Sequence, residues 1–169
     1  RIASDTCGPF PASPQGYTNA VTFIDLFSKY SATYFLKSQD SAEILLAVQT
    51  FMSDHKQWLS NTMIPGVVDE WFTDNGTEFM SGDIDTFCSE LGTRRAMSVP
   101  YVPERNAHAE RLWGILLRPM RAMLAHSGGA DSVKETLWPF LMMQATQIHN
   151  SLKTRSHDPP RAPLELLQP

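Results

Sequence analysis

The chain has 169 residues, a formal net charge of −4 and 42% apolar residues. This length fits one domain, and the apolar fraction can build a core, which excludes intrinsic disorder. Its two cysteines, Cys7 and Cys88, exclude a disulfide scaffold and a four-cysteine zinc site. No apolar run approaches the roughly 18 to 20 residues of a membrane helix. The chain starts without Met or a signal-peptide stretch, so we expect a fragment of a longer protein.

The charge is distributed unevenly. Residues 1–90 hold four Lys/Arg and twelve Asp/Glu, whereas residues 91–169 hold ten Lys/Arg and six Asp/Glu. Eight of the ten later cations are Arg, which suits bidentate phosphate contacts. Two interpretations stay open on charge alone: a metal-binding acidic half beside a phosphate-contacting half, or an ordinary solvated surface.

The first half of the chain predicts, in order, strands over residues 1–4, 19–25 and 32–36, a helix over 40–58 and a strand over 70–73. The strands are rich in β-branched and aromatic residues, and the second and third flank a turn, so they should pair as a hairpin. Asp40 precedes Glu43 by three residues, which resembles a capping box at a helix start.

The second half predicts a helix over residues 83–91, a strand over 94–99 and helices over 106–125 and 133–152. Pro119 lies inside the third of these segments and should kink or split that helix. Trp71, Trp138 and Phe140 are expected in the core. Because strands and helices interleave, the sequence indicates an α/β sheet with helices on its faces.

Three carboxylates stand at the ends of these elements. Asp5 ends the first strand, Asp74 follows the fourth, and Glu110 lies in the first turns of the long helix, so they can converge at one sheet edge. Such oxygen ligands suit Mg²⁺ or Mn²⁺, and two ions about 3.5–4 Å apart serve phosphoryl transfer. Taken singly, each has another explanation: a turn former for the two Asp, or an acid favoured by the helix dipole for Glu110.

Short motifs surround these carboxylates. Residues 73–79 read TDNGTEF, residues 98–106 read SVPYVPERN, and residues 109–111 read AER, with 35 residues between Asp74 and Glu110. These segments resemble the TDNGxEF, S-x-P-Y-x-P-x-x-N and A-E-R motifs of retroviral and retrotransposon integrase catalytic cores, the DDE family. The spacing also matches the D,D(35)E pattern of that family.

Further segments resemble copia-type elements in particular. Residues 5–9 (DTCGP) resemble the D-x-x-G-P at the first catalytic Asp, and FID at 23–25 with YFLK at 34–37 resembles F-I-D-D-x-S-R…Y-x-L-K. Near the C-terminus, APLE at 162–165 resembles T-P-Y-E. The chain departs from the family at Ala107, where Gly is usual, and at Leu26, where a second Asp is usual. Neither departure removes a carboxylate of the triad.

The resemblance implies an RNase H-like fold, with a five-stranded mixed sheet flanked by helices. It implies a catalytic core over residues 1–152, followed by a basic, Pro-rich tail over 153–169. The implied activity is DNA integration, in which 3′ ends of element DNA are processed and joined to target DNA. Two Mg²⁺ or Mn²⁺ ions are implied, one shared by Asp5 and Asp74 and the other by Asp5 and Glu110.

The resemblance also implies partners. Six residues are expected to contact DNA: Tyr101, Arg105, Asn106, Arg111, Arg118 and Arg121. One or more of the helical arginines is expected to pair with a surface acid instead. Double-stranded DNA, a second core in a dimer and flanking integrase domains are the expected partners, with no membrane. The nucleus and cytoplasmic virus-like particles are the expected locations. Two alternatives stay open: an RNase H-like nuclease that only hydrolyses, and a domesticated DNA- or protein-binding core without catalysis.

Overall fold

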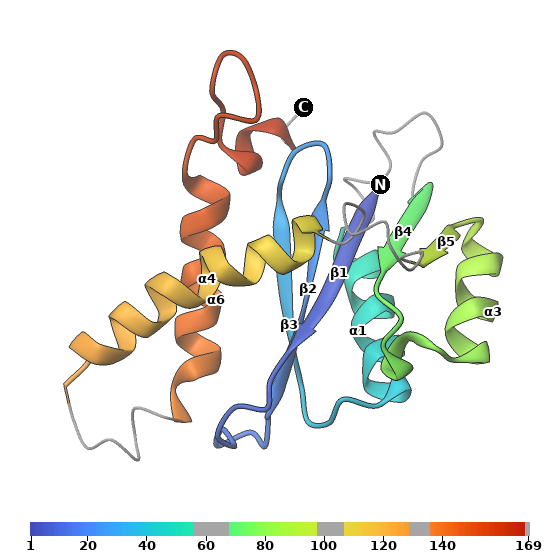
Figure 1. Ribbon diagram of the computed structural model, residues 1–169, viewed down its shortest axis with the longest axis horizontal. Helices are drawn as coiled ribbons and strands as arrows, with labels where there is room; N and C mark the ends of the chain where they lie inside the picture. The colour runs from blue at the N-terminus through green and yellow to red at the C-terminus, as the bar shows by residue number, and fades with distance from the viewer. Residues whose placement is uncertain (56–67, 98–106, 129–135, 168–169) are drawn as a thin grey trace.

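The computed structural model describes residues 1–55, 68–97, 107–128 and 136–167. Figure 1 shows a twisted sheet in the middle of the molecule with helices on both sides. The sheet has five strands in the order β3-β2-β1-β4-β5. The expected α/β class and the strand number are therefore confirmed. Tyr101, Arg105 and Asn106 lie outside the described residues.

The sheet is mixed, as expected. Its central strand β1 (Ile2–Cys7) runs antiparallel to β2 (Asn19–Asp25) and parallel to β4 (Glu70–Thr73). The predicted hairpin is formed by β2 and β3 (Ser31–Leu36), and β5 (Arg94–Met97) pairs in parallel with β4. Because β1, β4 and β5 are parallel, their C-terminal ends lie at the same end of the sheet.

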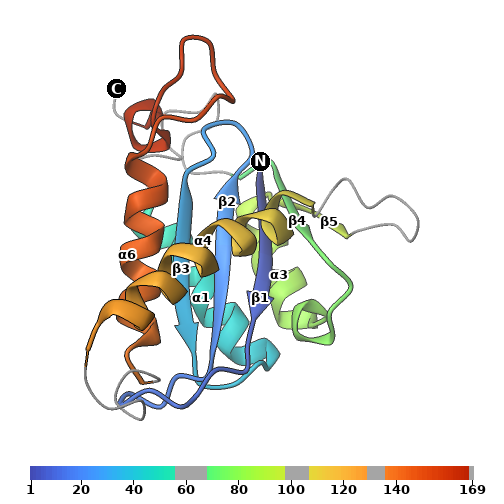
Figure 2. The same ribbon diagram turned by 60° about the vertical axis from the view of Figure 1, so that its left-hand side comes forward.

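Among the described residues, four α-helices cover the sheet. One face carries α1 (Ser41–Asp54) and α3 (Gly82–Leu91), and the other carries α4 (Ala107–His126) and α6 (Trp138–Ser151). Figure 2 shows α4 crossing the sheet beside α6. Short 3-10 turns, η1 (Thr77–Phe79) and η2 (Pro163–Leu166), complete the described elements. None of the described helices is both long and apolar enough to cross a membrane.

Local chemistry fixes the helix ends. The Asp40 carboxylate accepts a hydrogen bond from the Glu43 backbone N–H at 3.0 Å, so the predicted N-cap is confirmed. The Glu43 carboxylate instead accepts from the backbone N–H of Lys37 at 3.1 Å. After α3, Gly92 takes a left-handed φ of 70°, which ends that helix in the manner of a glycine C-cap.

Pro119 was expected to kink or split the long helix, and the split is wrong because α4 is continuous from Ala107 to His126, whereas the kink stays a prediction. A proline in a helix removes the hydrogen bond to the carbonyl four residues earlier, which here belongs to Ile115. Ile115 is 46% exposed, so water can reach that side of the helix. The helix therefore tolerates the proline without breaking.

Two apolar clusters lie on the two faces of the sheet. Trp71 is buried between the sheet, α1 and α3, and Trp138 is buried between the sheet, α4 and α6, so both predictions are confirmed. The prediction for Phe140 is wrong, because this side chain is 48% exposed. Residues two positions apart in an α-helix are rotated by about 200° about the axis, so Phe140 points away from the face that buries Trp138.

Candidate active site

Asp5 lies on the central strand of the sheet. Its side chain is half-buried, and its carboxylate accepts a hydrogen bond from the Thr6 backbone N–H at 2.9 Å. β1 is paired on both sides, by β2 and by β4. The neighbouring strands therefore fix the backbone from which Asp5 projects.

Asp74 follows directly after the last residue of β4. The parallel register pairs Ile2 with Trp71 and Ala3 with Phe72, and the same register continued by two residues sets Asp5 opposite Asp74. The Gly76 backbone N–H donates to the Asp74 carboxylate at 3.0 Å, which holds it in a local Asx turn. The two aspartates predicted from the sequence are thus brought to neighbouring positions.

Glu110 belongs to the first turn of α4, and its side chain is exposed. The helix packs on β1 and β2, because Ala109, Leu112 and Leu116 are buried against the sheet. This packing brings the charge of Glu110 close enough to affect Asp5. The third predicted carboxylate therefore approaches the same sheet edge from another layer.

The electrostatics of Asp5 reflect this crowding. The pKa of Asp5 is raised to about 6, chiefly by burial and next by the negative charge of Asp74. Within that net shift the hydrogen bond from Thr6 lowers the pKa, whereas the charges of Glu110 and Glu78 raise it. The neighbouring carboxylates thus disfavour the ionised form of Asp5.

No ligand cluster is closed in the described residues, which include all three predicted carboxylates. No group of three His, Cys, Asp or Glu side chains there is placed closely enough to hold a metal ion. The like charges of these carboxylates repel one another, and the side chain of Glu110 is exposed to solvent. The ligand set Asp5, Asp74 and Glu110 stays a prediction.

Glu78 is a site residue that sequence reasoning missed. Its carboxylate accepts hydrogen bonds from the Thr6 hydroxyl and from the Gln39 amide, each at 2.9 Å. A side chain on Gly76 would lie 2.5 Å from the Glu78 carboxylate, so the glycine makes room for it. The available signal was the Glu of the TDNGTEF segment, which lies one short turn beyond Asp74.

The three helical arginines predicted to contact DNA point in different directions. Arg121 lies near the end of β1, since its charge lowers the otherwise raised pKa of Cys7, and Arg111 lies near Lys29. Arg118 is exposed, and so are the other two. Among the described residues none of the three forms an ion pair, so the expected pairing with a surface acid is not observed there.

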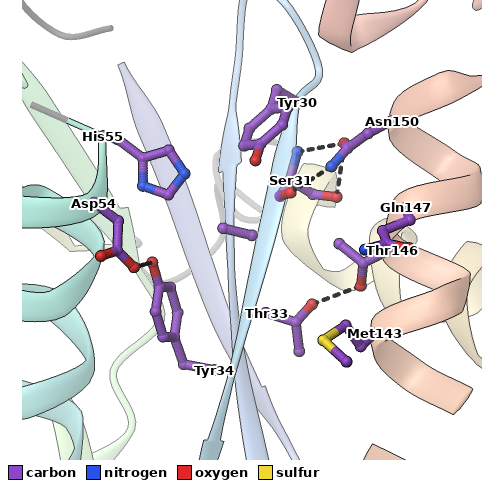
Figure 3. A pocket seen from close by; sticks show the side chains of 11 residues that line it. Tyr30, Ser31, Thr33, Tyr34, Asp54, His55, Met143, Thr146, Gln147 and Asn150 are labelled. Carbon is purple, nitrogen blue, oxygen red and sulfur yellow. Dashed lines mark hydrogen bonds between the residues drawn. The ribbon is translucent and has the colours of Figure 1, made fainter. Parts of the chain in front are cut away.

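A second concavity, of about 300 Å³, lies along the outer edge of β3 between α1 and α6. Figure 3 shows Tyr34 donating to Asp54 on one side and Thr33 facing Thr146 on the other. Burial, followed by the hydrogen bond to Asp54, raises the pKa of Tyr34. None of the three predicted catalytic carboxylates lines this concavity, so it is separate from the candidate active site.

A model of the TnsB C-terminal domain matches residues 13–125, two thirds of the chain. The chain belongs to this family. The matched segment contains Asp74 and Glu110 and begins after Asp5. The Pol polyprotein of the tobacco (Nicotiana tabacum) transposon TNT 1-94 is 32% identical to this integrase-like core over 124 residues, covering 73% of the chain and 9% of the polyprotein. The chain spans about a tenth of the length of the curated relatives that it matches.

Solved integrase cores share the fold of this integrase-like core. The catalytic core domain of BIV integrase has a TM-score of 0.66 at 16% identity and covers 98% of this chain and 91% of its own. The HTLV-2 integrase catalytic core, described in complex with magnesium in a trimeric form, has a TM-score of 0.68 at 16% identity and covers 99% and 95%. The expected RNase H-like fold is therefore confirmed, as is the recognition of a copia-like retrotransposon core.

Proposed function

We propose that this chain is the catalytic core of an integrase, a polynucleotidyl transferase that processes the 3′ ends of element DNA and joins them to target DNA. One observation supports the proposal: the charges of Asp74, which follows β4, and of Glu110 on α4 both act on the half-buried Asp5 of the neighbouring strand β1. Retrotransposon relatives and integrase core folds support the same activity.

Mg²⁺ or Mn²⁺ fits the chemistry of this donor set. The side chains offer only hard oxygen atoms. A divalent cation neutralises the negative charges that act on Asp5. Asp5 with Asp74 and Asp5 with Glu110 would hold the ions. When bound, such ions stabilise the charge that develops in an in-line displacement at phosphorus.

The protein itself contributes position and charge. The half-buried Asp5 is fixed by a central strand, and Asp74 is fixed by its bond from Gly76. Along α4, Arg121 is eleven residues from Glu110, which is about 20° around an ideal helix. Arg121 therefore lies on the face of Glu110, about 16 Å further along the helix axis, and is placed to bind a DNA phosphate on that face.

Titration of the chain with Mg²⁺ or Mn²⁺, followed by calorimetry, tests the metal assignment. Wild type should bind and Asp74→Asn should bind much more weakly, whereas Glu90→Gln, an exposed acid on α3, serves as the matched control. Equal binding by wild type and Asp74→Asn contradicts the site. In a joining assay with duplex oligonucleotides, cleavage without joined product would favour a nuclease that only hydrolyses.

The proposed partners are double-stranded DNA, flanking integrase domains and a second core. Exposed apolar side chains on α6 offer a surface for a dimer, notably Phe140 and Met143, which are 48% and 43% exposed. Sedimentation should show a dimer that Phe140→Glu weakens, and a monomer at high concentration contradicts it. The nucleus and cytoplasmic virus-like particles are the proposed locations, which imaging of the tagged element protein tests.

A further inference from the structure

A basic cavity of about 240 Å³ lies beside α4, and none of the three predicted catalytic carboxylates lines it. It is bounded by the β2–β3 turn, the start of α4, the end of α6 and the segment after α6. Its titratable lining residues are Lys29, His108, Arg111 and His149. No Asp or Glu is found among the described residues that line it. Four elements far apart in the sequence thus bring only basic titratable groups to one concavity.

Contacts within the protein hold the floor of this basic cavity. Lys29 has a left-handed φ of 64°, and its ammonium donates to the Leu26 carbonyl at 2.6 Å. The Lys29 carbonyl in turn accepts a hydrogen bond from Nε2 of His149 at 3.0 Å. This contact defines the tautomer of His149 and fixes its ring against the β2–β3 turn. The turn and α6 are therefore joined at the cavity.

The positive charges are close together, and the negative charge of Asp25 acts on Lys29 from outside the cavity lining. Burial lowers the pKa of His108, and the charges of Lys29 and Arg111 lower it further, which shows that these groups face one another. The nearest acid on the turn, Asp25, accepts two hydrogen bonds from Ser28 and does not line the cavity. Arg111 has no ion pair within the described part of the chain.

Hydroxyl groups complete the lining. Thr154 and Ser156 enter the cavity from the segment after α6. The Thr154 hydroxyl is buried and has no hydrogen-bond partner within the described residues. A buried hydroxyl without a partner costs free energy, so a bound group that accepts its hydrogen bond is favoured. Thr154 and Ser156 thus add uncharged hydrogen-bond donors to the lining of the cavity.

We propose that this basic cavity binds a phosphate group. A guanidinium fork, an ammonium and neutral hydroxyl donors, without a lining carboxylate, match the tetrahedral oxygens of a phosphate. The group can belong to a DNA strand or to a free polyphosphate. If it belongs to DNA, the cavity is a second anchor beside the catalytic helix, and that reading alone rests on the proposed integrase function.

Inorganic pyrophosphate is the probe, titrated by calorimetry into the full chain in EDTA so that no metal bridges it to the carboxylates. Wild type should bind, and Arg111→Gln and Lys29→Asn should each weaken binding about tenfold, the value of one charge-assisted hydrogen bond. Asn is chosen because it tolerates the left-handed backbone at position 29. Lys37→Gln, an exposed cation next to the end of β3 that does not line the cavity, is the matched control, and thermal melting verifies that each variant is folded.

Three results support the proposal and two overturn it. Binding that both cavity variants weaken and Lys37→Gln leaves unchanged supports it. Competition by a short DNA duplex identifies a DNA phosphate as the ligand, and tight binding without competition identifies a free polyphosphate. No binding to wild type overturns the proposal, as does equal binding by all variants. Asp74→Asn should bind pyrophosphate normally, so loss of integrase function and loss of this site remain distinguishable.

Discussion

The side chain of Asn150 on α6 takes the place of a neighbouring strand for Ser31 at the edge of β3. Its amide oxygen accepts from the Ser31 backbone N–H at 2.9 Å, and its amide nitrogen donates to the Ser31 carbonyl at 2.8 Å (Figure 3). Both residues are buried. Among the described residues no strand pairs with this edge of β3. The Asn150 side chain therefore forms the hydrogen bonds with the Ser31 backbone that a further strand would form.

Replacing Asn150 with Ala should lower the free energy of unfolding by about 2 kcal/mol. Both Ser31 backbone groups would lose their partner while they remain buried, and each unsatisfied group carries a desolvation cost. Urea denaturation at pH 7 measures the change, with Gln147→Ala, an exposed change on the same helix, as the control. If both variants unfold at the same urea concentration, the Asn150–Ser31 contact does not stabilise the fold.

Asp5→Asn should stabilise the metal-free chain at pH 7.5 by about 1 kcal/mol, a value reduced from the full pKa shift because Asp5 is partly exposed to solvent. The folded-state pKa of Asp5 is raised to about 6 from 3.8. Its stabilising contribution is therefore complete below pH 3.8 and is lost as the pH rises through about 6. The neutral Asn avoids this loss.

Thermal melts of wild type and Asp5→Asn in EDTA, from pH 3.5 to 8, measure the effect. The two curves should coincide near pH 4, separate between about pH 4 and 6, and stay a constant distance apart at higher pH. Saturating Mg²⁺ should reverse the order, because only the wild-type carboxylate gains a cation. A difference in stability that is constant across this pH range would show that Asp5 does not titrate as described.

The sequence predicted the elements well because each carries local signals. The N-cap at Asp40 and the glycine stop at Gly92 are set by neighbouring residues, and both are observed. Contacts between distant segments could not be predicted this way. Asn150 meets Ser31 across 119 residues, and Glu78 meets Thr6 across 72, so only the packed fold reveals those roles.

In the candidate site, too, the sequence predicted some features and could not predict others. Their positions at element ends and the family motifs pointed to Asp5, Asp74 and Glu110, and the charges of the other two act on Asp5. Their catalytic role stays a prediction. The direction of each arginine on α4 was not predictable, because it depends on how the helix is rotated over the sheet. That rotation sends Arg121 toward the end of β1 and Arg111 toward Lys29.

Gly76→Ala should destabilise the fold by about 1 kcal/mol. A Cβ at this position would lie 2.5 Å from the Glu78 carboxylate, which must then leave its hydrogen bonds to Thr6 and Gln39. Gly82→Ala is the matched control, because a Cβ there meets nothing within 4 Å and the residue begins α3. Urea unfolding compares the two, and the expectation fails if Gly76→Ala is as stable as Gly82→Ala.

Gly114→Ala should separate stability from DNA joining. Gly114 lies inside α4, one turn after Glu110 and on nearly the same face, and a Cβ there meets nothing within 4 Å. Packing within the chain therefore does not require the glycine, and Ala should raise the free energy of unfolding by about 0.5–1 kcal/mol. The bare backbone does allow a DNA strand to approach closely beside Glu110, so joining should fall while metal binding is unchanged.

The matched control for this variant is Ala122→Leu, an exposed position on the same helix that lies about 120° around from Glu110. It adds bulk to α4 but not on the face of Glu110, so joining should stay at the wild-type level. Urea unfolding and joining of duplex oligonucleotides are measured on all three proteins. If Gly114→Ala gains stability and joins DNA as well as wild type, the DNA does not pass over this turn of α4, and the proposed DNA contact on that face would have to lie nearer Arg121.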